Sequence, residues 1–256
     1  MSSLRIHAAL RVALWHLLLS AAVLGMAAAL VFWLWYPSPY DKIIHGRELF
    51  IIVLLVDMVC GPLLTLILFD PAKSRAKWLT DVVLIAGIQV GAMAYGVGQV
   101  ASARPVWLAF EGDRFRIVQA NDVDRAKLGD AEPRFQSLSW RGPEVIGVAL
   151  MSSGGSEYLK SIQEALHGNH PAFRPSRWVA YEQQKPLVLA AAKNINALIA
   201  GDSAKRKRVD EYLAEHQLDA SAIGAIPLVA GRTNDWAVLV NLKTAIPVGY
   251  LNMDAW

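Results

Sequence analysis

Residues Leu49–Phe69, LFIIVLLVDMVCGPLLTLILF, form an apolar run of 21 residues that contains one charged side chain, Asp57. As an α-helix this run is about 32 Å long, at about 1.5 Å per residue. That length matches a bilayer hydrocarbon core of about 30 Å, so we expect a transmembrane helix with a carboxyl group near its middle. A charge at that depth is costly, and Asp57 should therefore face protein or a cavity rather than lipid.

The residues after Asp57 predict a stripe of polar and small side chains on the same helix. Gly61 and Thr65 follow at four-residue intervals, so the three residues share one face. Pro62 removes the hydrogen bond that residue 62 would donate to the Met58 carbonyl, and a kink is expected there. Two interpretations are open. The stripe is a docking notch for another helix or a proton site, or else Asp57 is a protonated or hydrogen-bonded residue inside the three-helix bundle.

Two further apolar runs, Leu10–Tyr36 and Leu79–Ala101, each contain one charged residue near the start. The first run is longer than the apolar core of a secretory signal, which spans about 7–15 residues. The sequence therefore predicts a membrane domain over residues 1–101, with transmembrane helices at about 10–36, 49–69 and 79–101.

Small residues recur at four-residue spacing in the first and third of these helices. Such stripes let helix backbones approach closely. Packing within the bundle is the favoured interpretation, and a face for a partner helix is the alternative. The residues are Ala21, Gly25 and Ala29, then Gly87 and Gly91, with Ala92 and Gly96 on a neighbouring face.

Lys and Arg in short loops predict the orientation in the membrane. The N-terminal segment and the 70–78 loop are basic, whereas the loop between the first two helices balances its charges. We therefore expect a cytoplasmic N-terminus in the bacterial inner membrane and a periplasmic C-terminal domain. An aromatic belt is expected at the outer interface, formed by Trp33, Trp35, Tyr36 and Tyr40, with Trp78 at the inner one.

Charge is distributed unevenly along the chain. Residues 1–101 hold 7 Lys and Arg and 5 Asp and Glu, whereas residues 102–256 hold 18 and 17. The second part is therefore an ordinary globular domain, large enough for its own core. A net charge of +3, with no large basic surplus, argues against a nucleic-acid binder. The single cysteine, Cys60, excludes a disulfide within the chain.

The exported domain, residues 102–256, begins with strands, continues with helices and ends with strands. That order suggests an α+β fold around an antiparallel sheet. Strands are expected at 105–110, 114–118, 144–151, 225–229, 236–242 and 247–252, and helices at 156–167, with Ser156 as N-cap, 185–199 and 203–216.

This domain offers little catalytic chemistry. It contains neither a Gly-x-Ser-x-Gly elbow nor a His-Glu-x-x-His helix. His167 and His170 lack the further ligands that a zinc site needs. The basic run Lys205–Arg208 is interpreted as a solvated helix start, and a contact with an acidic partner or lipid head groups is the alternative. We expect no catalytic residue, no metal site and no cofactor.

The sequence resembles the type IV pilin accessory proteins of the TfpX/TfpZ type. The resemblance is specific from about Leu14 to Asp122 and collinear beyond it. The family's ending resembles a Pro-Trp pair, where this chain has Ala255-Trp256. The stretches that carry it are FWLWYP (32–37), VDMVCGPLLTL (56–66) with Phe69, Gln89 with AYG (94–96), RPVWLAF (104–110), DRF (113–115), AND (120–122) and VLV (238–240).

The resemblance implies an inner-membrane, pilin-specific chaperone that stabilises the major pilin before or during pilus assembly. Its implied partners are the transmembrane helix and globular domain of that pilin, and membrane lipid. It implies no enzymatic activity, cofactor, small-molecule substrate or nucleic acid. We hypothesise that the pilin helix contacts the face shaped by Asp57, Gly61, Pro62 and Thr65. Trp107 and Phe110 are expected to anchor a hairpin to the core of the exported domain.

Two alternatives from other classes remain. One is a membrane-anchored periplasmic enzyme acting on pilin or envelope polymers, and the other is a sensor subunit with a separate output protein. An enzyme should show a cleft with convergent carboxylates, His or Ser. A chaperone should show an exposed apolar groove or an open sheet edge.

Overall fold

The computed structural model describes residues 3–151, 154–231 and 233–256. It divides into two compact units, Met1–Ala103 and Arg104–Trp256. We call them the N-terminal and C-terminal units and describe each by itself.

The N-terminal unit contains three long helices in the positions that the apolar runs predict. Each is long and apolar enough to cross a membrane, which confirms the predicted membrane α class. They are α1 (Ser3–Leu30), which continues as the π-helix η1 (Val31–Trp35), α3 (Gly46–Leu68) and α4 (Arg75–Ser102), with the short α2 (Tyr40–Ile43) before α3.

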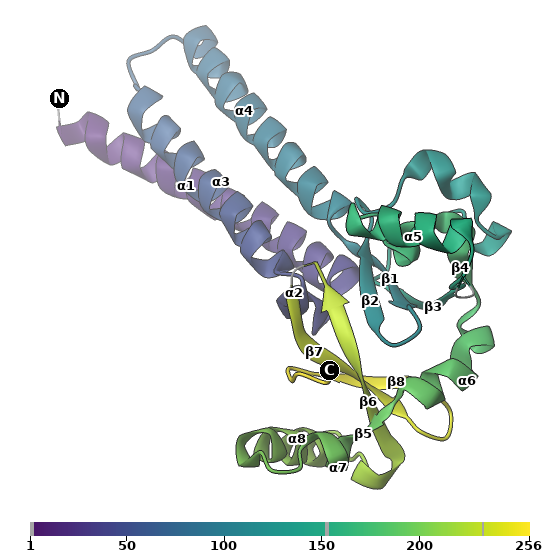
Figure 1. Ribbon diagram of the computed structural model, residues 1–256. Coiled ribbons are helices and arrows are strands. Elements are labelled where there is room, and N and C mark those ends of the chain that lie inside the picture. The colour runs from purple at the N-terminus through teal and green to yellow at the C-terminus, as the bar shows by residue number, and fades with distance from the viewer. Residues whose placement is uncertain (1–2, 152–153, 232) are drawn as a thin grey trace. The chain divides into compact units, whose positions relative to one another are not determined.

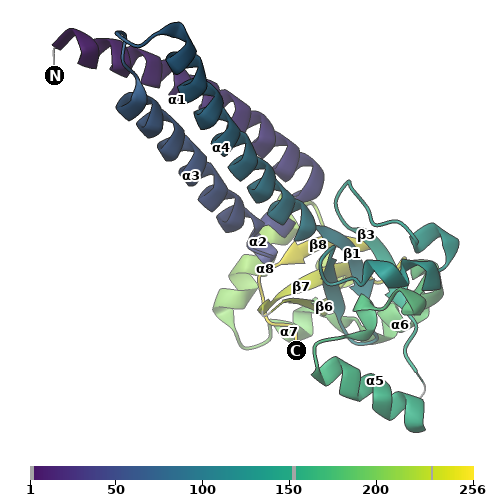
Figure 2. The same ribbon diagram turned by 90° about the horizontal axis from the view of Figure 1, so that it is seen from above.

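Helix α3 packs against both α1 and α4 (Figures 1 and 2). One end of the bundle is closed by a buried cluster that includes Trp35, Tyr36 and Phe50, and the Tyr36 hydroxyl donates to the Val100 carbonyl over 2.8 Å. Trp35, Tyr36 and Tyr40 are buried, so the prediction of an interfacial belt is wrong for them. Trp35 and Tyr36 belong to this cluster between the helices. Trp33, in contrast, is 90% exposed.

Several glycines of the N-terminal unit lie where no neighbouring residue packs against them. A Cβ atom added at Gly25, Gly87 or Gly91 would meet no atom within 4 Å. The expectation that these small residues pack within the bundle is therefore wrong for these three. Gly96, on the neighbouring face of α4, is buried.

The C-terminal unit is an α+β structure built on one sheet with the strand order β4-β3-β1-β2-β6-β7-β8, and β5 pairs with β6 beside this path. The strands are β1 (Pro105–Phe110), β2 (Phe115–Gln119), β3 (Glu144–Val148), β4 (Trp178–Val179), β5 (Lys193–Asn194), β6 (Ile223–Ala230), β7 (Thr233–Asn241) and β8 (Pro247–Leu251).

The sheet is mixed, so the prediction of a purely antiparallel sheet is wrong in two places. β1 pairs with β3 in parallel, and β2 pairs with β6 in parallel. Parallel neighbours need a long connection between them. Residues 120–143 precede β3, and the connection from β2 to β6 contains β3, β4 and β5 as well as several helices. The hairpin of β1 and β2 is antiparallel as predicted, and Gly112 turns it with a φ of 85°.

The helices of this unit follow the predicted order with shifted bounds. The predicted helix at 185–199 is wrong in extent. The chain is extended at Ala192, pairs as β5, and restarts as a helix after Asn194, whose side chain accepts from the Asn196 amide. Gly155, not Ser156, occupies the N-cap of α5. The helices are α5 (Ser156–Leu166), α6 (Tyr181–Ala191), α7 (Ile195–Leu198) and α8 (Ser203–Glu215), with 3-10 turns at Arg125–Asp130, Pro133–Phe135, Pro171–Phe173, Pro175–Arg177 and Ala220–Ala222.

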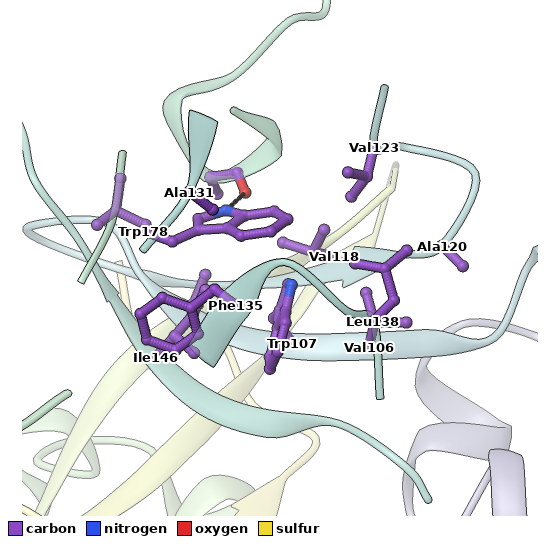
Figure 3. Close-up of a cluster of buried hydrophobic side chains, with 13 residues drawn as sticks. Val106, Trp107, Val118, Ala120, Val123, Ala131, Phe135, Leu138, Ile146 and Trp178 are labelled. Atoms are coloured by element: carbon purple, nitrogen blue, oxygen red, sulfur yellow. Dashed lines mark hydrogen bonds between the residues drawn. The ribbon is translucent and has the colours of Figure 1, made fainter. Parts of the chain in front are cut away.

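Two buried clusters form the core of the C-terminal unit. One gathers side chains of β1–β4 around Trp107 and Trp178 (Figure 3). The rings of these two tryptophans lie edge to face, with 5.5 Å between their centroids. The other packs α7 and α8 against β6, β7 and β8. Trp107 and Phe110 are almost fully buried, which confirms that they anchor the hairpin.

Candidate functional site

A groove runs between α1 and α4 in the N-terminal unit. It comprises two connected hollows of about 340 Å³ and about 190 Å³, which share His16, Leu19 and Ala86. We call it the α1–α4 groove. Its walls are mainly apolar, with Trp15, Leu19 and Val90 each at least 60% exposed. Its polar lining includes His16, Asp57, Thr65 and Gln89.

His16 links all three long helices through its two ring nitrogens. Nδ1 of His16 lies 2.5 Å from the Thr65 hydroxyl on α3, and Nε2 lies 2.6 Å from Oε1 of Gln89 on α4. Since a carbonyl oxygen can only accept, Nε2 donates to Gln89. Both ring nitrogens are therefore engaged within the bundle.

Gln89 reaches α3 at the point where Gly61 leaves room for it. A Cβ atom at Gly61 would collide with the Gln89 carboxamide. From there, Nε2 of Gln89 donates to the main-chain carbonyl of Asp57 over 3.4 Å. Gly61 thus permits the close approach of the Gln89 side chain to α3, which makes this hydrogen bond possible.

The Asp57 carboxyl differs from its polar neighbours. Asp57 is 6% exposed and lines the smaller hollow of the groove. Among the residues that the structure describes, none forms a hydrogen bond or ion pair with this carboxyl. A buried acidic group without a partner is costly in an apolar environment, so Asp57 holds unused bonding capacity directed at the groove.

The structure places the predicted stripe on the inner face of α3. Asp57, Gly61 and Thr65 are all buried, and Pro62 beside them is half-buried. α3 remains helical through Pro62. Whether these residues bind a partner stays a prediction.

His16 is the functional-site candidate that sequence reasoning missed, and Gln89 entered only through the family resemblance. His16 is the one histidine in the run Leu10–Tyr36. A histidine inside an apolar run could have indicated this site, because polar side chains inside membrane helices tend to face protein.

One end of the α1–α4 groove lies beside the turn between α3 and α4. Nζ of Lys73 lies 2.5 Å from the Asp81 carboxylate and donates to the Leu68 carbonyl over 2.8 Å. This pair ties the turn together and neutralises the charge of Asp81, which lines the groove there.

The C-terminal unit has a polar depression of about 430 Å³, lined by four carboxylates, Asp122, Asp124, Asp130 and Glu164. Three of these carboxylates form hydrogen bonds or an ion pair with nearby residues of the same unit. Asp122 accepts from the Gln119 amide, Asp124 caps a 3-10 turn, and Glu164 pairs with Arg174 at 2.9 Å. Burial raises the pKa of the Asp122 carboxyl. In the described part of the chain, no group of three His, Cys, Asp or Glu residues is arranged to hold a metal ion.

A buried ion pair joins the β1–β2 hairpin to the turn at Pro171–Phe173. Nε of Arg116 donates to Glu111 over 2.9 Å, and the other Glu111 oxygen accepts from the Ala172 amide. Burial lowers the pKa of the neighbouring His170 imidazole, and the positive charge of Arg116 lowers it further. Arg104, also buried, donates to the Ser139 carbonyl and lies over the Trp140 ring. These charges support the fold.

Comparisons with known proteins find related sequences. A family profile described as "Fimbrial assembly protein FimB" matches residues 4–45. Two proteins of Dichelobacter nodosus, "Fimbrial assembly protein, serogroup I" and "Fimbrial assembly protein, serogroup E1", are each 33% identical over 238 residues, which cover 91% of this chain and 92% of each relative.

A third relative from Dichelobacter nodosus, "Fimbrial assembly protein, serogroups C1 and C2", is 43% identical over 108 residues, or 42% of this chain and 82% of that protein. No solved structure matches the chain.

Proposed function

Since the chain belongs to the fimbrial assembly protein family, it acts in fimbrial assembly, and we propose that it does so as a membrane-bound chaperone for the major pilin. In this proposal it holds the pilin in the inner membrane until the subunit enters the pilus. It performs no chemical reaction on the pilin.

The α1–α4 groove is the observation that carries the proposal. It is open and apolar along its walls, and the buried Asp57 carboxyl in its lining has no described partner. A transmembrane helix fits such a surface, because close packing and a few interhelical hydrogen bonds drive helix association in lipid. Of the four residues predicted to form the contact, Asp57 and Thr65 line the groove, and we assign the contact to them. Gly61 lies under the Gln89 carboxamide, and neither it nor Pro62 lines the groove.

A second contact is proposed on the C-terminal unit. Helix α5 exposes Leu159 and Leu166 at 66% and 82%, beside an apolar hollow of about 280 Å³. An unassembled pilin presents a globular domain as well as a helix. Binding both parts at once raises the effective concentration of each contact.

The proposal places the N-terminus in the cytoplasm and the C-terminal unit in the periplasm. Support comes from the basic N-terminal segment and the basic turn between α3 and α4. The enzymatic alternative has less support, because three of the four carboxylates of the polar depression cap, pair or accept hydrogen bonds within the fold.

Photo-crosslinking in cells that make pili tests the proposal. A photoreactive residue is placed at Val90, which lines the groove, or at Leu159 on α5. Val83, with an exposure of 62% on α4 but outside the groove, is the matched control. We expect pilin adducts from Val90 and Leu159 and none from Val83. Absence of pilin adducts at both test positions contradicts the proposal.

A further inference from the structure

We propose that the α1–α4 groove recognises a transmembrane helix that presents one hydrogen-bond donor to the Asp57 carboxyl. This inference rests on the proposed function and adds the chemistry by which the client is selected. The donor is a hydroxyl, amide or amine group on an otherwise apolar helix, located at the depth of Asp57.

The hydrogen bonds around Asp57 indicate what the client must supply. His16 is engaged on both sides by Thr65 and Gln89. Gln89 uses its amide on the main-chain carbonyl of Asp57, not on the carboxyl. The carboxyl is thus an acceptor in the groove that these described neighbours leave unused.

The cost of burying that carboxyl gives the groove its selectivity. Asp57 is 6% exposed in the chain alone, and an occupant would remove the access that remains. An acyl chain or a wholly apolar helix would leave the carboxyl without a partner, which costs more than leaving it accessible. A helix with a correctly placed donor would satisfy it. The same group therefore rejects one class of helix and accepts the other.

The walls of the groove fit the rest of such a helix. Trp15, Leu19 and Val90 supply apolar contact area on α1 and α4. The charge of Asp81 at the end of the groove is already paired with Lys73. The observations thus call for a polar group in the client opposite Asp57, and for apolar residues opposite Trp15, Leu19 and Val90.

The first experiment measures the pilin adduct from a photoreactive residue at Val90 in variants of position 57. Asp57→Leu removes the acceptor, and we expect the adduct yield to fall about three- to tenfold, the effect of losing one interhelical hydrogen bond. Asp57→Asn keeps an acceptor oxygen and should retain most of the yield. Val59→Leu, on the exposed side of α3, is the matched control and should leave the yield unchanged.

The second experiment changes the client. Each polar residue of the pilin's apolar helix is replaced by Leu in turn, with Asp57 intact. We expect one replacement to reproduce the loss of adduct and to add nothing further when combined with Asp57→Leu. If Asp57→Leu lowers the amount of this chain itself, the client series with the intact chain decides the question.

The outcomes separate this inference from the proposed function. An unchanged adduct in Asp57→Leu, or a client series in which no polar position matters, overturns the donor inference while the chaperone proposal stands. Adducts from Val90 only to lipid or to a second copy of the chain also overturn it, provided that Leu159 still captures pilin. Loss of pilin adducts at both positions in the unmodified chain overturns the proposed function.

Discussion

At Gly61, the absence of a side chain determines how closely α4 approaches α3. The Gln89 carboxamide occupies the space that a Cβ atom would need. This contact brings Gln89 within reach of His16 and of the Asp57 main chain. The glycine at position 61 thus allows α1, α3 and α4 to be joined by one network of hydrogen bonds.

His170 makes the stability of the C-terminal unit depend on pH. Burial and the charge of Arg116 lower the pKa of its imidazole in the folded state. As pH falls below about 6.5, the unfolded chain takes up this proton first, so the free energy of unfolding decreases. Glu111 opposes the shift, whereas Arg114 and Arg174 add to it.

The predicted variant is His170→Gln, which removes this titration. Between pH 7.5 and pH 5.5, the Tm of the full-length protein in detergent should fall less for the variant than for the unchanged chain. His167→Gln, at the exposed end of α5, is the control. Equal falls in Tm for His170→Gln and the unchanged chain would contradict the assignment.

At the scale of elements, helix α8 covers part of the edge of the sheet that β8 forms. β8 is the last strand of the path, and the Tyr250 amide on its outer side donates to the Tyr212 hydroxyl of α8 over 3.3 Å. Gly249 allows this approach, because a Cβ atom there would collide with Tyr212. Covering an edge strand in this way opposes pairing with other chains.

Tyr212→Phe should remove this hydrogen bond while its ring keeps the stacking on His216, whose centroid lies 4.0 Å away. We expect the free energy of unfolding to fall by about 1 kcal/mol, measured by urea denaturation of the full-length protein in detergent. Tyr158→Phe on α5 serves as the control, since its hydroxyl takes part in no described hydrogen bond. An equal loss in both variants would contradict a stabilising contribution from the hydrogen bond between Tyr250 and Tyr212.

Local patterns in the sequence predicted the elements better than their pairing. The three long helices follow from apolar runs, and the β1–β2 hairpin follows from two adjacent strands with a glycine turn. The parallel pairs of β1 with β3 and β2 with β6 were missed, since they depend on long connections whose path no local pattern specifies. β5 was missed because two residues carry no periodicity.

In the candidate site, too, local features were predictable from the sequence and long-range contacts were not. The shared face of Asp57, Gly61 and Thr65 was predictable because helical spacing is local. The bonds of His16 to Thr65 and Gln89 span 49 and 73 residues of sequence, so spacing alone could not predict them.

At the scale of the whole molecule, the orientation in the membrane can be measured with single cysteines. Cys60 is the only cysteine, so Cys60→Ser provides a background without thiols. Asp130→Cys and Ala72→Cys then report on two exposed positions, one in each unit. We expect a membrane-impermeant maleimide to label Asp130→Cys in spheroplasts and Ala72→Cys only after lysis. The reverse pattern would contradict a periplasmic C-terminal unit.

The open side of the α1–α4 groove has a kinetic consequence for the proposed chaperone. Its wall residues Trp15, Leu19 and Val90 are exposed, so the groove opens sideways from the bundle instead of enclosing its contents. A client helix can enter and leave by two-dimensional diffusion in the plane of the bilayer. Release then needs no extraction from the membrane and no unfolding, and one copy of the chain can serve many subunits in succession.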